Sequence, residues 1–379
     1  MDAHTNTPVD PGGLLEYSVV FTDRSLNHMS QAFQGVMRDI HAGLTEVYNA
    51  ETAVIVPGGG SIGIEAVARQ FATGKSALVV RTGWFSYRWS QVFEAGGVPK
   101  TTRVILGEKT GEATDAPFAP PPIETVIAAI EADKPDVVCA AHVETSAGMI
   151  LPDSYIKAMA DAVHAHGGLM ILDCVASGCV WVDMKATGAD VLISAPQKGW
   201  SSTPCAGLIM LSARGVEMLG ETKSSSFALD LAKWHQIMQA YTGGGHAYHA
   251  TMPTDALRQF RDAMEETRAF GFASAADAQW QLGDRVRGLL EQQGFRSVAA
   301  DGFRAPGVVV SYTDDPSKKS GAAFAAEGMQ IAAGVPLEVG EGPDFSTFRI
   351  GLFGLDKLQN IERTVARLDD VLGRVQKAA

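Results

Sequence analysis

GLMILDCVAS at residues 168–177 and DVLISAPQKGW at 190–200 are two apolar runs from which the fold class can be predicted. Similar runs lie at 53–57 (AVIVP), 76–83 (SALVVRTG), 136–144 (DVVCAAHVE) and 207–215 (GLIMLSARG). Continuous apolar runs are typical of strands buried on both faces, and most of these are separated by stretches with helical spacing of apolar residues. The alternation predicts an α/β fold in which helices cover both faces of a mostly parallel sheet.

The composition and the pattern of apolar residues change at two places along the chain. The start, MDAHTNTPVDPGGLL, is polar and rich in proline and glycine, and residues 26–48 then have the apolar spacing of a helix. From about residue 254 a long charged helical pattern leads into the short strands GVVVSYT (307–313) and STFRIGLFG (346–354) and a last helix. We therefore predict an arm at 1–20, a large α/β domain at 21–265 and a smaller α+β domain at 266–379.

Composition excludes several classes of partner. The 379 residues include 31 basic and 43 acidic side chains, and the net charge of −12 repels phosphate backbones, so we expect no nucleic-acid partner. No uncharged apolar stretch reaches the ~20 residues that a membrane helix needs, so we expect no membrane partner. The four cysteines lie among apolar neighbours without the spacing of metal ligands. They indicate free thiols, no metal site and a cytoplasmic protein.

A glycine-rich turn follows the first apolar run. PGGGSIG (57–63) contains G-x-G-x-x-G between a strand and a helix, which is the pattern of a dinucleotide-binding loop. Such a loop requires an acidic residue at the end of the next strand, where this chain has Arg81 and Thr82. A helix N-terminus still binds anions through its backbone N–H groups, so we expect a phosphate near Gly60 and Ser61. An NAD(P)-dependent dehydrogenase remains the alternative interpretation of this loop.

Two charged residues follow the runs quoted at the start. Asp173 ends the first run and Lys198 follows the second, and ligands of open α/β sheets lie at the carboxyl ends of strands. A phosphate site, an acid and a lysine at one sheet edge are what pyridoxal phosphate requires. The lysine forms a Schiff base, the acid holds the proton of the pyridinium nitrogen, and the helix N-terminus takes the phosphate. Phe85 or Trp84 could stack on the ring.

Seven segments occur in the order found in one enzyme family: GGGSIGIEA, TGWFSYRW, HVETSAG, LDCVAS, SAPQKGWSSTPCAG, AYHATMP and FRIGLFG. On these segments the chain resembles the class V aminotransferases of fold type I, in the branch of alanine–glyoxylate and serine–glyoxylate aminotransferases. The resemblance runs from about residue 26 to the C-terminus. It implies pyridoxal 5'-phosphate as the cofactor, a seven-stranded sheet in the large domain and a homodimer.

The resemblance also implies roles for individual residues. Lys198 and Asp173 would be catalytic, and Arg349 would bind the substrate carboxylate. His28 lies where serine–glyoxylate enzymes have an Asp-His pair, so it would contact substrate, or else it is a packed core histidine. The residues that would bind the cofactor are Gly60, Ser61, Phe85, Thr145, Asp173, Gln197, Lys198, Tyr248 and Thr251, the last two reaching the phosphate of the neighbouring subunit.

The residues around Arg349 also indicate, without the resemblance, that it faces a carboxylate. It lies among apolar residues, where an unpaired guanidinium would be costly to bury, so it must face a carboxylate of the protein or of a ligand.

These roles predict a ping-pong transamination between small molecules. Alanine or serine would give its amino group to glyoxylate or pyruvate. An aminophosphonate transaminase remains an alternative, because it shares the motifs and differs mainly in the donor. The N-terminal P-G-P segment of the family is replaced here by GLLEYSVVFTDRSLNHMS (13–30), so the pocket for the donor side chain does not transfer.

Overall fold

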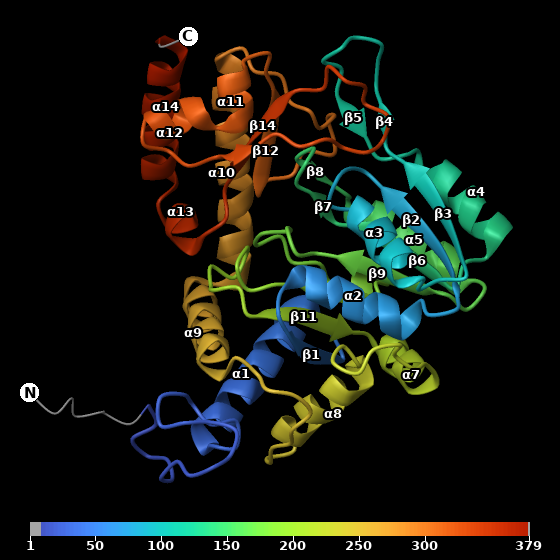
Figure 1. Ribbon diagram of the computed structural model, residues 1–379. Coiled ribbons are helices and arrows are strands. Elements are labelled where there is room, and N and C mark those ends of the chain that lie inside the picture. The colour runs from blue at the N-terminus through green and yellow to red at the C-terminus, as the bar shows by residue number, and fades with distance from the viewer. Residues whose placement is uncertain (1–8, 378–379) are drawn as a thin grey trace, which may run out of the picture.

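The large sheet of the structure confirms the predicted α/β fold. The computed structural model describes residues 9–377 (Figure 1). Seven strands form one sheet in the order β1-β11-β10-β9-β6-β2-β3, where they span β1 (Thr52–Pro57), β2 (Ser76–Arg81), β3 (Thr101–Leu106), β6 (Val137–Ala141), β9 (Leu169–Asp173), β10 (Val191–Ser194) and β11 (Ala206–Leu211). Within this sheet β11 is antiparallel to β1 and β10, and the other pairs are parallel.

Helices connect the strands and cover the sheet. They are α1 (Gln31–Tyr48), α2 (Gly60–Phe71), α3 (Tyr87–Gly96), α4 (Ile123–Asp133), α5 (Asp153–His164), α6 (Met184–Thr187), α7 (Ala213–Glu221), α8 (Leu231–Thr242) and α9 (Thr254–Phe270). Helices α1 and α8 pack on β1, α2 packs on β10 and β11, and α5 packs on β9. Strands β1, β9, β10 and β11 are almost fully buried, as their continuous apolar sequence predicts, whereas the edge strand β3 is largely exposed.

Two boundaries differ from the sequence-based prediction for the same physical reason. The helix predicted over 26–48 begins only at Gln31, because the side chain of Ser30 accepts a hydrogen bond from the backbone N–H of Phe33 and caps it. The strand predicted over 207–215 ends at Leu211, because Ser212 caps α7 by accepting from the N–H of Gly215. Apolar spacing alone did not reveal either serine cap.

A second, smaller sheet follows later in the chain. Three antiparallel strands lie in the order β12 (Val308–Tyr312), β14 (Thr347–Gly351) and β13 (Ala332–Ala333). The helices around them are α10 (Phe272–Gln292), α11 (Pro316–Ser320), α12 (Ala322–Ala326), α13 (Leu355–Gln359) and α14 (Ile361–Lys377). In Figure 1 this part lies at the upper left, above the large sheet. Two short hairpins complete the fold, formed by β4 (Glu108–Lys109) with β5 (Phe118–Ala119) and by β7 (Val143–Glu144) with β8 (Met149–Ile150).

The buried apolar residues form three clusters. The first surrounds the large sheet and includes the inner face of α9, up to Met264. The second lies between α10, α14 and the small sheet, and the third joins β7 and β8 to β12. Gly271, with a φ of 98°, makes the turn between α9 and α10 that only glycine adopts easily. The division into arm, large domain and small domain stays a prediction.

No helix within residues 9–377 is both long enough and apolar enough to cross a lipid bilayer.

Candidate active site

The carboxyl edge of the large sheet gathers most of the predicted site residues. Parallel strands end at the same edge, so the loops that follow them meet there. Asp173 is the last residue of β9, and Lys198 follows β10. The loops after β1, β2 and β6 bring Gly60, Phe85 and Thr145 to this same edge.

Asp173 is a buried acid with few partners. Its side chain accepts one hydrogen bond, from the backbone N–H of Val175 to Oδ1 at 2.9 Å, and it is 7% exposed. Burial raises the pKa of Asp173 to about 7, helped by the negative charge of Glu144 and opposed by the Val175 N–H and the charge of Arg88. Such a carboxyl group can share a proton with a ring nitrogen near neutral pH.

Replacing Asp173 with asparagine should alter the pH dependence of stability of the cofactor-free protein. Between the ordinary pKa of 3.8 and about 7, the folded protein keeps a proton that the unfolded chain has lost. Its free energy of unfolding therefore falls as pH rises through this window, by on the order of 4 kcal/mol for this one group, and the Asn variant lacks this loss. We expect urea unfolding between pH 4 and 8 to show that the free energy of unfolding of the variant, relative to that of the wild type, increases as the pH rises. A difference that does not change with pH would contradict the prediction.

Lys198 has a desolvated side chain without a carboxylate partner. Burial and the nearby charge of Arg349 lower the pKa of Lys198. Its Nζ lies 5.3 Å from the centre of the Phe353 ring, and no ion pair to Nζ forms within residues 9–377. A Cβ on Gly199 would lie 2.0 Å from the carbonyl oxygen of Gly178, so the loop can only approach so closely with glycine there. The structure thus holds an amine whose proton is easily lost at this edge.

Arg349 reaches the site from the small sheet. On β14, its Nε donates to the carbonyl of Ala333 at 2.8 Å and its Nη1 donates to the carbonyl of Thr145 at 3.5 Å. Its Cζ lies 5.6 Å from the centre of the Phe85 ring. Burial lowers the pKa of Arg349, and the charge of Glu144 opposes this shift. Since the half-buried Arg349 forms no ion pair with any carboxylate of the described chain, its charge is available to a ligand.

The glycine turn after β1 lies beside Asp173. Its Gly59 is the N-cap of α2, and no side chain caps this helix. A Cβ on Gly60 would lie 2.7 Å from the Val175 side chain, so the turn packs directly on the residue two positions after Asp173. Ser61 Oγ accepts a hydrogen bond from Arg88 at 3.4 Å. The uncapped helix N-terminus is a site for an anion.

Gln197 lies in the same loop as Lys198. Its Oε1 is buried and finds no hydrogen-bond partner in the described part of the chain. A buried acceptor without a partner is costly, so a ligand group that donates to it would be favoured.

The remaining predicted residues form a separate group. The hydroxyl groups of Tyr248 and Thr251 lie 3.1 Å apart, and the His28 ring centre lies 5.5 Å from that of Tyr248. His28 is buried, its Nδ1 has no partner in the described chain, and burial with the charge of His246 lowers its pKa. No hydrogen bond or ring contact of residues 9–377 joins this group to Lys198. Within one chain, therefore, the structure does not bring these three residues into contact with the others.

Two residues of the site were missed in the sequence. Glu144 is a buried acid in HVETSAG that influences the pKa values of both Asp173 and Arg349. Arg88 contacts Ser61 and influences the pKa of Asp173. Glu144 is the only acidic residue in HVETSAG and follows the mainly apolar residues 137–143, and this is a signal in the sequence. Arg88 carried no such signal, because it lies in an ordinary helical pattern.

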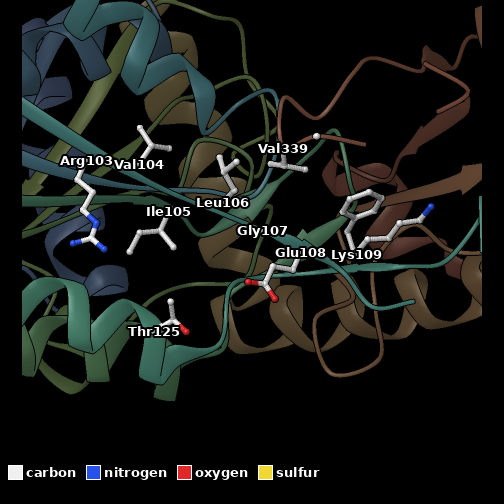
Figure 2. A pocket seen from close by; sticks show the side chains of 11 residues that line it. Arg103, Val104, Ile105, Leu106, Gly107, Glu108, Lys109, Thr125 and Val339 are labelled. Carbon is white, nitrogen blue, oxygen red and sulfur yellow. The ribbon is translucent and has the colours of Figure 1, made fainter. Parts of the chain in front are cut away.

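Two well-defined cavities lie elsewhere. Figure 2 shows a cavity of about 470 Å³ beside the edge strand β3, with Arg103, Val104 and Ile105 on one side and Val339 on the other. A second cavity, of about 300 Å³, lies beside α10. None of the predicted site residues line either cavity. The candidate site is therefore defined by Lys198 and Arg349, which lack a carboxylate partner in the described chain, and by the unpartnered Oε1 of Gln197.

Known proteins are similar to this chain along most of its length. A 2-aminoethylphosphonate–pyruvate transaminase from Vibrio parahaemolyticus is 26% identical over 336 residues, which cover 87% of this chain and 86% of that protein. The small subunit of a soluble hydrogenase from a Synechococcus species is 25% identical over 373 residues, covering 97% and 91%.

Solved structures share the fold. An alanine–glyoxylate aminotransferase from a Nostoc species superposes with a TM-score of 0.77 at 22% identity, covering 92% of this chain and 89% of that one. A pyridoxamine–pyruvate aminotransferase from Mesorhizobium loti gives a TM-score of 0.78 at 19% identity, covering 93% and 86%. The family model described as Aminotransferase class-V matches residues 15–334. The chain belongs to the class-V aminotransferase family.

Proposed function

We propose that this aminotransferase uses pyridoxal 5'-phosphate to move the amino group of alanine or serine to glyoxylate or pyruvate. One observation carries the proposal: Lys198 follows β10, Asp173 ends the neighbouring strand β9, and Arg349 comes close enough to Lys198 to lower its pKa, while neither cation has a carboxylate partner within the described chain. A cofactor with an aldehyde and a ring nitrogen, and a substrate with a carboxylate, would satisfy all three. This arrangement also argues against the dehydrogenase alternative, which gives Lys198 no role.

The residues at this edge fit the cofactor. Asp173 would face its ring nitrogen, Phe85 would stack on its ring and Thr145 would hydrogen-bond to it. Its phosphate would accept hydrogen bonds from the N–H groups of Gly60 and Ser61, and from the NH2 of Gln197 when the amide turns over, which would also move the unpartnered Oε1 from its buried position. When bound, pyridoxal phosphate supplies an electron sink for the electrons left when the substrate Cα loses its proton.

The chain's own residues then carry out binding and proton transfer. The planar guanidinium of Arg349 binds the substrate carboxylate with two parallel hydrogen bonds. The lowered pKa of Lys198 favours the free amine, which takes the proton from the substrate Cα as general base. Asp173 keeps the ring nitrogen protonated. The second half-reaction reverses these steps with the oxo acid, which carries the same carboxylate.

An aminophosphonate donor is the second candidate. It is favoured by the Vibrio relative, whose name gives 2-aminoethylphosphonate and pyruvate as its substrates. Arg349 could meet a phosphonate as well as a carboxylate, because its fork binds both kinds of oxyanion. The two candidates differ in the donor, not in the roles of Lys198 and Asp173.

The deciding experiment is a substrate panel. The purified protein should be yellow with bound pyridoxal phosphate, and alanine, serine and 2-aminoethylphosphonate should each be tested with glyoxylate and pyruvate. Turnover with alanine or serine supports the first candidate, and turnover confined to the phosphonate supports the second. A colourless protein that binds nicotinamide nucleotides would refute both.

Arg349→Lys should lower kcat/KM for both the amino donor and the oxo acceptor. Lysine keeps the charge but cannot form the two parallel hydrogen bonds, so we expect a loss of roughly tenfold or more in each. Steady-state kinetics with each substrate varied measure the effect, and Arg363→Lys on the surface is the control. A large fall in melting temperature with both constants unchanged would instead make Arg349 a structural residue.

We further propose a cytoplasmic homodimer in which Tyr248 and Thr251 serve the phosphate of the partner subunit. The proposal is supported by two observations: no hydrogen bond or ring contact of residues 9–377 joins Tyr248 or Thr251 to Lys198, and the four cysteines are buried and free, as is typical of a reducing compartment. Mixing inactive Lys198→Ala with an inactive Tyr248→Phe/Thr251→Ala variant should restore activity, because a hybrid dimer has one intact site. If differently tagged subunits exchange and activity never appears, the sites are not shared.

A further inference from the structure

The carboxylate of Glu144 is one of the most heavily hydrogen-bonded groups at the site. The residue ends β7 and is 1% exposed. Its Oε1 accepts from the N–H of Phe85 at 3.1 Å and from the N–H and hydroxyl of Ser146 at 3.1 and 2.7 Å. Its Oε2 accepts from the N–H and hydroxyl of Ser86, both at 2.8 Å. Both oxygens are thus fully used within the protein.

The negative charge of Glu144 has no salt bridge in residues 9–377. Instead, N–H and O–H dipoles surround it, as they do for a carboxylate in a helix cap. The charged groups that it influences are Arg349 and Asp173, the two ends of the proposed substrate and cofactor site. Glu144 therefore lies near enough to Arg349 and Asp173 to influence both, without occupying the ligand-binding atoms of either.

The same hydrogen bonds join two turns. The first turn, at 82–86, carries Phe85, and the second, at 144–146, carries Thr145. The turns also meet directly, because Trp84 N–H donates to the Ser146 hydroxyl at 3.0 Å. A Cβ on Gly83 would lie 2.2 Å from that hydroxyl oxygen, so this approach requires glycine.

Arg349 depends on both turns. Its guanidinium lies over the Phe85 ring and donates to the Thr145 carbonyl. Movement of either turn would displace the guanidinium and the ring together. The buried carboxylate of Glu144 thus holds the turns that position Phe85, proposed to stack on the cofactor, and Arg349, proposed to bind the substrate.

We infer that Glu144 is a positioning residue that fixes Phe85 against the cofactor ring and Arg349 against the substrate carboxylate. The inference rests on the proposed function, which assigns those two roles. It extends that function by naming the group that couples cofactor binding to substrate binding.

Glu144→Gln tests the inference. The amide has the same shape but only one acceptor oxygen, and its NH2 would face hydrogen-bond donors. We expect the affinity for pyridoxal phosphate, followed by quenching of tryptophan fluorescence, to fall roughly tenfold or more. We also expect KM for donor and acceptor to rise, because Arg349 moves. Borohydride reduction of the variant with bound cofactor should still attach the pyridoxyl group to Lys198.

Asp190→Asn is the matched control. Asp190 is 2% exposed and accepts from the N–H of Met170, the hydroxyl of Ser212 and the ring of His164. It precedes β10 and so lies at the opposite edge of the same sheet. This variant should lose stability with little change in cofactor affinity or in either KM.

The outcomes separate the inference from the proposed function. If the wild-type protein binds no pyridoxal phosphate, the proposed function fails. If the wild type binds it and Glu144→Gln binds it equally well with both KM values unchanged, the inference alone is overturned. Should Glu144→Gln not fold, Ser146→Ala decides, because it removes one donor to Glu144. We then expect a weaker loss of affinity and a rise in both KM values, and unchanged values would overturn the inference.

Discussion

Lys198→Ala should lower turnover by about 10²–10⁴-fold, the usual contribution of a positioned general base. The variant also loses the amine that would attach pyridoxal phosphate covalently, so its yellow colour should shift to that of the free cofactor. Because the side chain forms no ion pair within residues 9–377, its removal should not unfold the protein. Turnover, absorbance and melting temperature measure these effects, with the exposed Lys185→Ala as the control.

Borohydride reduction makes this prediction decisive. Reduction of the wild-type protein with bound cofactor, followed by peptide mapping, should place the pyridoxyl label on the peptide that contains Lys198. A label on another lysine would end the assignment, even if the Lys198→Ala variant were inactive.

Asp173→Asn should keep the cofactor but lose most of the turnover. An amide cannot hold a proton on the ring nitrogen by charge, and a hydrogen bond to a charged group contributes about 1.5–3 kcal/mol. One factor of ten in rate corresponds to ~1.4 kcal/mol, so we expect a loss of at least roughly tenfold in kcat. Cofactor content and kcat are the measurements, and Asp161→Asn, at an exposed ion pair with Lys157, is the control. Near-normal kcat would remove Asp173 from the mechanism.

The sequence was enough to predict some residues of the candidate site and left questions about others open. Asp173 and Lys198 were found because each follows an apolar strand, and the carboxyl ends of neighbouring parallel strands meet in space. Arg349 was singled out as a charge among apolar residues, but the sequence left open whether a carboxylate of the protein paired with it. The structure answers that question for the described chain, where Arg349 contacts backbone carbonyls and the Phe85 ring.

Other parts of the site depended on contacts that no local pattern records. Glu144 was visible as an acid in an apolar run, but three of its five hydrogen bonds come from a turn that follows a different strand. The start of α1 depended on one hydrogen bond from Ser30, which apolar spacing does not encode. The roles of the site residues themselves stay predictions until the variants above are measured.

The sequence was enough to predict the strands, the helices and the mostly parallel sheet, because burial leaves local patterns of apolar residues. It also showed that Asp173 and Lys198 follow strands, and parallel strands end at the same edge of a sheet. Two features appear only in the folded chain: Arg349 on the small sheet comes close enough to Lys198 to lower its pKa, and Glu144 joins two turns. Such contacts join segments far apart in the chain. They depend on close backbone approaches, as at Gly199, which only the packed fold creates.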